Sequence, residues 1–306
     1  MRIHKSIFAL LMFVAVAPGG TAQEFELSNV ALADPVGQSR ELTALANRVL
    51  PVYKEDNRET YLSNTFALEV VAGKYLLQDK VNYQVTGANV WKHAPSLAGM
   101  TGQTLRLYLS STKSDLAYKL NAQKDSGDSF VPLKVDMADR SDANRESPGG
   151  GVLDKAVDTW NGIEFVTDPL PKPTELSGLF SGQLDLVITK KDFDFEIQLY
   201  ELTAQGDYVQ LAPYWARSSY VADRSRRHLL TPGKRERMEF QSVRLMSRQL
   251  QQGSRVVAVF AAIKEPGRQI NYGTGKDVSD ETIQDAGVPL EIKLYADSYL
   301  DLPVGR

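Results

Sequence analysis

A serine hydrolase of the common α/β type carries its nucleophile in a G-x-S-x-G turn, which lifts the serine hydroxyl clear of the sheet. This sequence contains no such pentapeptide, and the nearest segment, residues 177–182 (SGLFSG), has the wrong spacing. Outside the first 22 residues the sequence has only His93 and His228 to serve as a base, and His228 follows two arginines that disfavour its protonated form. We therefore predict that this chain holds no catalytic residue.

Cysteine and histidine usage narrows the chemistry further. With no cysteine and three histidines, the sequence excludes thiol nucleophiles, zinc fingers and iron–sulfur sites and disfavours a histidine-rich metal site. We expect neither a metal nor another cofactor. The net charge is −3, so no global basic field points to nucleic acid.

A glycine-rich segment at residues 273–276 (GTGK) invites comparison with a phosphate-binding loop. The required pattern is G-x-x-x-x-G-K-[ST]. Here Ile270 occupies the first glycine position and Asp277 the serine or threonine position, where its carboxylate would repel phosphate. The segment therefore does not predict a nucleotide site.

Three acidic residues, Asp192, Asp194 and Glu196, alternate with apolar residues, so a strand would put them on one face. Paired carboxylates can hold Ca²⁺ or perform acid/base hydrolysis. Along a strand, Asp192 and Asp194 would lie about 6.6–6.8 Å apart, a separation compatible with an inverting hydrolase. The simpler interpretation is a solvated or inter-domain face, because Lys190 and Lys191 adjoin and neutralise it.

A basic stretch follows these acids, with aromatic residues beside it. Its members are Arg217, Arg224, Arg226, Arg227, Lys234, Arg235 and Arg237. Tyr214, Trp215 and Tyr220 lie nearby, and basic groups among aromatic rings suit an anionic ligand or polymer. A solvated loop or a docking surface for an acidic partner would give the same pattern.

Residues 1–22 have the features of a secretory signal peptide. A basic start precedes an apolar run over residues 7–17, and the small residues Gly20 and Ala22 stand at the cleavage positions. The run is too short to cross a bilayer, and no later run of about 18 apolar residues follows, so we predict no membrane span in the mature chain. Export without cysteine predicts a bacterial periplasmic or extracellular protein.

The hydrophobic period changes near residue 80. Residues 39–50 and about 59–78 space their apolar side chains as helices do, which predicts a short helical hairpin. After residue 80 the apolar residues alternate, and Val256–Ile263 is apolar on both faces, which predicts a buried central strand. About ten predicted strands with almost no helix indicate a mostly β chain folded as a two-layer sandwich or jelly roll.

Short blocks along this β region stand in one characteristic order: 85–91 (VTGANVW), 162–170 (GIEFVTDPL), 191–195 (KDFDF), 199–202 (LYEL), 217–220 (RSSY), 230–233 (LTPG), 271–275 (NYGTG) and 302–304 (LPV). In these blocks, residues 81–306 resemble the C-terminal, non-catalytic jelly-roll domain of X-Pro dipeptidyl-peptidases and cocaine-esterase-like serine hydrolases. Weaker matches at residues 57–62 and 71–75 are similar to the helical leader of exported members.

The resemblance implies a galactose-binding-like jelly-roll β-sandwich over residues 81–306, behind a signal peptide at 1–22 and a helical segment at 23–80. In the family, the catalytic Ser, Asp and His lie in an α/β-hydrolase domain N-terminal to the jelly roll, and none of them maps onto this sequence. We therefore expect a non-catalytic accessory domain of an exported serine hydrolase acting on peptide or ester bonds, from a truncated or internally deleted member.

The resemblance also gives the acidic face of Asp192, Asp194 and Glu196 a role, namely docking to a separate α/β-hydrolase domain. Without that domain a partly apolar face would favour self-association. The alternative function is a stand-alone carbohydrate- or ligand-binding module. Its candidate stacking residues are Trp160, Tyr214, Trp215 and Tyr220.

Overall fold

The computed structural model describes residues 79–306 except 115–116, 142–144, 149–150 and 266. The predicted signal peptide and the helices predicted at 39–50 and 59–78 lie outside the described residues. The chain divides into two compact units. The larger contains Val85–Val90 and Leu97–Arg306, and the described part of the smaller is 79–84 and Trp91–Ser96.

Strands β1 (Val81–Val85) and β2 (Val90–Ala94) pair with each other as a separate two-stranded sheet. Their connection turns through Gly87, whose φ of 82° favours glycine. A Cβ on Gly87 would also lie 2.6 Å from the carbonyl oxygen of Gln249, so this position excludes larger residues.

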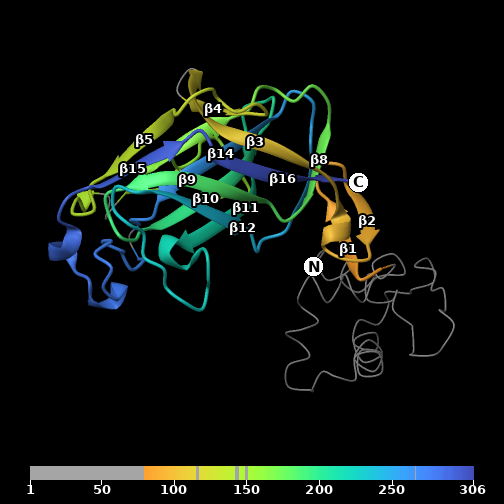
Figure 1. Ribbon diagram of the computed structural model, residues 1–306. Coiled ribbons are helices and arrows are strands. Elements are labelled where there is room, and N and C mark those ends of the chain that lie inside the picture. Colours follow the sequence, from red (N-terminus) through yellow and green to blue (C-terminus); the bar gives the residue numbers. More distant parts are fainter. Residues whose placement is uncertain (1–78, 115–116, 142–144, 149–150, 266) are drawn as a thin grey trace, which may run out of the picture. The chain divides into compact units, whose positions relative to one another are not determined.

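The other strands form one 14-stranded sheet, which folds over into two layers. The first layer contains β5 (Phe130–Val135), β8 (Thr174–Gly178), β9 (Ser181–Ile188), β12 (Arg235–Gln241), β13 (Met246–Leu250), β15 (Leu290–Tyr295) and β16 (Tyr299–Gly305). The second contains β4 (Ala117–Asn121), β6 (Leu153–Asp154), β7 (Gly162–Val166), β10 (Asp194–Leu202), β11 (Tyr208–Arg217) and β14 (Arg255–Ala262). Figure 1 shows β15 and β16 one after the other alongside β9 in the first layer.

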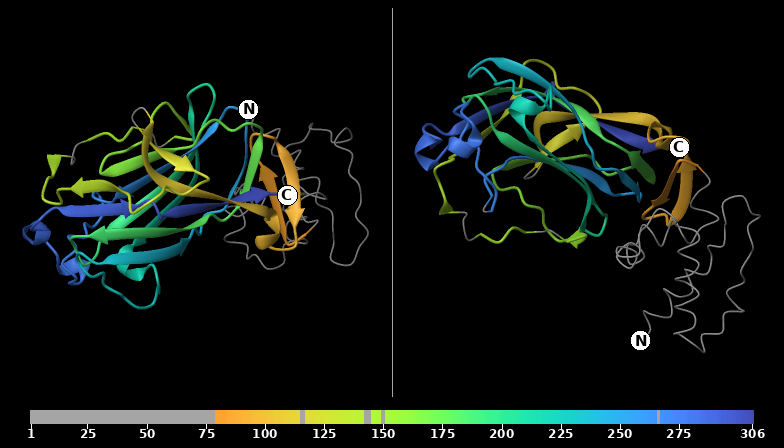
Figure 2. Two further views of the ribbon diagram at one scale, coloured as in Figure 1. Left: turned by 45° about the horizontal axis from the view of Figure 1, so that its top comes forward. Right: turned by 90° about the horizontal axis from the view of Figure 1, so that it is seen from below.

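Strand β3 (Thr101–Ser114) joins the two layers, because it pairs with β16 along its first part and with β4 at its end. Its register shifts between Leu109 and Lys113, where the strand turns from one layer to the other. Figure 2 shows this long strand (gold) curving across the sandwich. Only β4 and β7 pair in parallel among the described strands; the remaining pairs are antiparallel.

The helical content of the described chain is limited to 3₁₀ turns. These are η3 (Ala98–Met100), η5 (Ser218–Tyr220), η6 (Val278–Asp280) and η7 (Ile283–Ala286). No helix among the residues described is long and apolar enough to cross a membrane.

The mostly β sandwich predicted from the alternating sequence is confirmed. Strand β14 runs between β10 and β7 and is buried on both faces, as predicted for Val256–Ile263. Strand β10 begins at Asp194, so Asp192 stands before the strand and its carboxylate does not share the alternation of Asp194 and Glu196.

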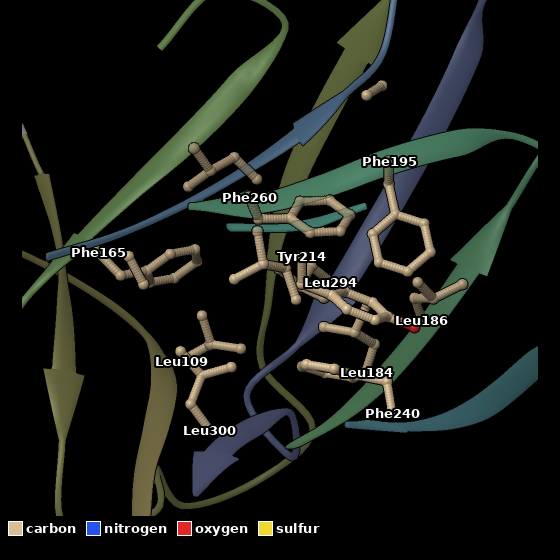
Figure 3. Close-up of a cluster of buried hydrophobic side chains, with 14 of the residues drawn as sticks. Leu109, Phe165, Leu184, Leu186, Phe195, Tyr214, Phe240, Phe260, Leu294 and Leu300 are labelled. Atoms are coloured by element: carbon tan, nitrogen blue, oxygen red, sulfur yellow. The ribbon is translucent and has the colours of Figure 1, made fainter. Parts of the chain in front are cut away.

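The core lies between the layers. Phe195, Tyr214 and Phe260 come from the second layer, while Leu184, Leu186 and Phe240 come from the first (Figure 3). The ring of Tyr214 stacks on that of Phe240 with centroids 4.6 Å apart, although their strands β11 and β12 are not paired. Burial of each large apolar side chain stabilises the fold by about 1.5–3 kcal/mol.

Replacing Leu294 by alanine tests this core. The Leu294 side chain is fully buried on β15. Leu294→Ala should lower the free energy of unfolding by about 2–5 kcal/mol, because it removes buried methyl groups and leaves a cavity. Urea unfolding followed by circular dichroism measures this. Leu153→Ala, at a leucine 61% exposed on β6, is the matched control and should change stability by less than about 0.5 kcal/mol. Equal losses for both would contradict the assigned core.

Candidate functional site

The carboxylate of Asp192 is fully buried and fully hydrogen-bonded. Its Oδ1 accepts from the hydroxyl of Ser218 (2.7 Å) and the backbone N–H of Ser219 (3.0 Å). Its Oδ2 accepts from the hydroxyl of Ser219 (2.8 Å) and from Nη2 of Arg227 (2.9 Å). A buried charge is tolerated only when it is paired and hydrogen-bonded in this way. Asp192 therefore offers no carboxylate oxygen to solvent or substrate.

Asp192 also ties segments that are far apart in the sequence. Arg227 donates from Nη1 to the carbonyls of Gly275 (3.3 Å) and Lys276 (2.5 Å). Gly273 has a φ of 79°, and a Cβ there would lie 2.6 Å from the carbonyl oxygen of Asp192. The blocks at 191–195, 217–220 and 271–275 thus meet at one polar cluster, which we call the Asp192 cluster: Asp192, Ser218, Ser219, Arg227 and the loop 271–276.

The glycine-rich loop already holds an anion, which is the side chain of Glu281. Its carboxylate accepts from the backbone N–H groups of Tyr272 (2.7 Å) and Thr274 (2.8 Å) and from the Thr274 hydroxyl. The backbone donors that a phosphate would need here are therefore occupied by the protein itself, in agreement with the sequence argument against a nucleotide site.

Asp194 and Glu196 lie half-buried on the outer face of β10, and both are partnered. Asp194 forms a bidentate pair with Arg217 (2.8 and 3.0 Å) and accepts from Asn271 (2.9 Å). Glu196 accepts from the indole N–H of Trp215 (2.7 Å) and the amide of Gln198 (3.1 Å). The three acidic residues therefore do not form one face. Asp192 is buried, whereas Asp194 and Glu196 are half-buried at the surface and held by hydrogen bonds.

A fourth carboxylate, Glu164 on β7, shares the outer face of the second layer. Burial raises the pKa of Glu164 and of Glu196, and hydrogen bonds from Tyr208 and from Trp215, respectively, oppose the rise. Glu164 stands between Ile163 and Phe165, which are both buried. This short alternation is the signal that places Glu164 on the outer face.

The basic stretch does not form one surface patch. Arg217 pairs with Asp194, Arg227 with Asp192, and Arg235 and Arg237 both pair with the buried Asp185. Three of its seven members therefore neutralise buried carboxylates, and Arg217 pairs with the half-buried Asp194.

Between β11 and β12 the structure has an open cavity of about 1000 Å³. Aromatic and charged residues from β11, η5 and the turn after β12 line it, among them Tyr214, Trp215, Arg217, Tyr220, Arg224, Glu239, Gln241, Val243 and Arg244. Three of the four predicted stacking residues thus lie at one cavity.

The fourth predicted stacking residue, Trp160, is not among the residues that line this cavity. It precedes β7, and the guanidinium of Arg145 lies 4.2 Å from its ring centroid. Arg244 also lines the cavity, and the sequence does not point to it because it lies outside the basic stretch, in the turn after β12.

Over the residues that the structure describes, no three His, Asp or Glu side chains come together as a metal site. Nδ1 of His93 lies 3.8 Å from Asp79, and His228 is held through its backbone N–H on the carbonyl of Ser219. The Ser219 hydroxyl donates to Asp192 and accepts from Arg227, so no histidine activates it.

Solved structures with a similar fold are hydrolases. An aminopeptidase from a marine sediment Thaumarchaeota archaeon aligns with a TM-score of 0.61 and 14% identity, covering 83% of this chain and 46% of that one. An α-amino acid ester hydrolase aligns with a TM-score of 0.58 and 17% identity, covering 82% of this chain and 46% of that one. A CocE/NonD family hydrolase from Staphylococcus aureus aligns with a TM-score of 0.52 and 16% identity, covering 85% of this chain and 47% of that one. This chain thus spans less than half the length of each, and at these identities the likeness establishes the fold alone.

The fold is a β-sandwich of the kind that these larger hydrolases contain as one part. Residues 76–284 match the X-Pro dipeptidyl-peptidase C-terminal non-catalytic domain, and the chain belongs to this family. The family resemblance seen in the sequence blocks is thereby confirmed. A search of curated proteins gave no significant match.

Replacing Asp192 by asparagine tests the Asp192 cluster. The change leaves Arg227 without its carboxylate and turns an NH₂ group toward donors, so the free energy of unfolding should fall by at least about 2 kcal/mol. Urea unfolding of the purified variant measures the loss. Asp280→Asn, at an exposed aspartate in η6, is the control and should stay within about 0.5 kcal/mol of wild type. An Asp192→Asn variant with unchanged free energy of unfolding would show that the cluster does not hold the loops.

The raised pKa of Glu164 predicts a pH effect on stability. The folded protein keeps this proton to a higher pH than the unfolded chain, so wild-type stability falls as pH rises from the ordinary glutamate pKa, near about 4.3, toward the raised pKa. Glutamine has no proton to lose and so gains no buried charge, and the stability of Glu164→Gln relative to wild type should therefore rise between pH 4 and pH 7. Urea titrations at both pH values test this. The exposed Glu146→Gln serves as control, and a flat difference for Glu164→Gln would contradict the prediction.

Proposed function

We propose that this chain is a non-catalytic accessory domain of an exported serine hydrolase that acts on peptide or ester bonds, and that it has no hydrolytic activity of its own. The match of residues 76–284 to the family's C-terminal non-catalytic domain is the observation that carries the proposal. The similar solved structures, which are hydrolases about twice as long as the aligned region, support it. The predicted signal peptide at residues 1–22 supports export to the periplasm or beyond.

In this proposal the chain docks on a separate α/β-hydrolase domain through the outer face at β10. Asp194 and Glu196 are half-buried there, beside Trp215, which is 40% exposed. Arg217 and Asn271 fix Asp194, and the Asp192 cluster beneath holds that end of the strand. A face braced by such contacts is preorganised, which lowers the entropy lost on docking.

Turnover assays test the absence of catalysis. The purified full chain should release no product from an X-Pro dipeptide p-nitroanilide or a p-nitrophenyl acyl ester above the uncatalysed rate. A hydrolase of this family run in parallel shows that the assay detects activity. Turnover that co-purifies with the chain through several columns and survives replacement of its serines would overturn the non-catalytic assignment.

Docking needs a second experiment with a defined partner. Cross-linking of the full chain in its native host should join it to an α/β-hydrolase, whose kcat/KM or thermal stability then rises when the purified chain is added back. Asp194→Asn should weaken the complex, while Asp280→Asn should not. Sedimentation velocity of the chain alone tests the related proposal of self-association, which a single monomeric boundary over a wide concentration range would contradict.

A further inference from the structure

The cavity between β11 and β12 exists because both strands are edges where they face it. Residues 210–217 of β11 pair with β10 alone, since β6 reaches only Tyr208 and Val209. Strand β12 pairs with β9 alone among the described strands. A second cavity of about 440 Å³ shares Leu179 and Gln241 with the first, so the two adjoin. Together they give an elongated site rather than a single small pocket.

The aromatic residues of the cavity are held in place. Tyr214 stacks on Phe240 at the floor, and the indole N–H of Trp215 is fixed on Glu196 while the residue stays 40% exposed. Tyr220 lies on η5, which Ser218 anchors to Asp192. Fixed rings beside an open cavity are platforms on which the apolar face of a flat or ring-shaped ligand can pack.

The arginines that line the cavity differ in whether they already form ion pairs. Arg217 is paired with Asp194, whereas the guanidinium groups of Arg224 and Arg244 make no hydrogen bond or ion pair within the part of the chain that is described. Arg244 is nevertheless positioned, because its backbone N–H donates to the buried hydroxyl of Ser242 (3.0 Å). Glu239 is the one acidic residue in the lining. The positive charges of Arg224 and Arg244 therefore favour an anionic ligand with carboxylate-like groups.

The edges do not suit an added peptide strand. Pro213, on the free edge of β11, has no backbone N–H to donate, and a proline on an edge interrupts strand addition. The β12 edge exposes charged Arg237 and Glu239, which also guard an edge against pairing. A ligand recognised by rings and side chains satisfies the site better than one recognised by its main chain.

We propose that the cavity between β11 and β12, together with the smaller cavity that adjoins it, binds an acidic oligosaccharide, in which sugar rings pack on Trp215 and Tyr220 and uronate carboxylates pair with Arg224 and Arg244. The exposed polar side chains of Gln241 and Glu239 are placed to take sugar hydroxyls. This site goes beyond the docking function proposed above and does not require it, although Trp215 belongs to both surfaces, so a docked hydrolase would compete with the ligand for this ring.

Isothermal titration calorimetry of the full chain with tetragalacturonate, at pH 7 and low salt, tests the site. Tetragalacturonate should bind with an affinity that falls as salt is raised, and the uncharged galactotetraose should bind at least about tenfold more weakly. The double variant Arg224→Gln/Arg244→Gln should lose at least about tenfold in affinity for tetragalacturonate. Arg226→Gln, an exposed arginine in the same loop but outside the lining, is the matched control and should bind as wild type.

Trp215→Phe separates the aromatic contact from the charges, because it keeps a ring and should retain salt-dependent binding at reduced affinity. No tetragalacturonate binding by the folded wild-type chain at millimolar ligand would overturn the proposal. So would equal loss in Arg226→Gln, or tighter binding of a tetraglutamate peptide than of tetragalacturonate, which would assign the site to acidic peptides. Since these measurements use no hydrolase, failure here leaves the docking proposal intact, and failure of docking leaves this site intact.

Discussion

The buried carboxylate of Asp192 is the interaction on which the loops around the start of β10 and the end of β11 depend. Taking this charge out of water is costly, and the cost is offset only because two serines and Arg227 converge on it. These contacts fix η5 at the end of β11. Arg227 then carries the constraint to the loop 271–276 through backbone carbonyls. Three loops with little regular structure are thus held by one internal anion.

Other buried carboxylates of the larger unit also hold distant segments together. Asp185 is fully buried and receives Arg235 and Arg237, and Glu201 receives Arg248. Glu281 takes the backbone donors of the glycine-rich loop. Each carboxylate lies where strand ends or turns leave donors unpaired, so these buried carboxylates cross-link segments that are distant in the sequence. A chain without cysteine gains its loop order from charge-assisted hydrogen bonds.

The cavity follows from how the sheet ends. Closing the second layer needs strands beside β11, but β6 is two residues long, so most of that edge stays open toward β12. Tyr214 and Phe240 seal the core beneath the opening by stacking across it. The aromatic floor therefore serves packing, and Arg224 and Arg244 beside it make no ion pair among the described residues.

The sequence by itself determined the mostly β fold, the central position of β14 and the family, because period-two alternation and the order of short blocks are local signals. It also excluded a phosphate loop at residues 273–276. Only the tertiary structure decided that Asp192 is internal while Asp194 and Glu196 stay at the surface.

Tertiary packing also decided which cations are free. Alternation assigns a residue to a face of its own strand, but it cannot say what packs against that face from elsewhere in the chain. Arg227 and Arg224 look alike in the sequence, yet one neutralises Asp192 from a distance of 35 residues and the other faces the cavity. Trp215 lines the cavity and Trp160 does not, for the same reason. The packing of strands that are distant in the sequence decides which rings share a cavity, and spacing along the chain does not.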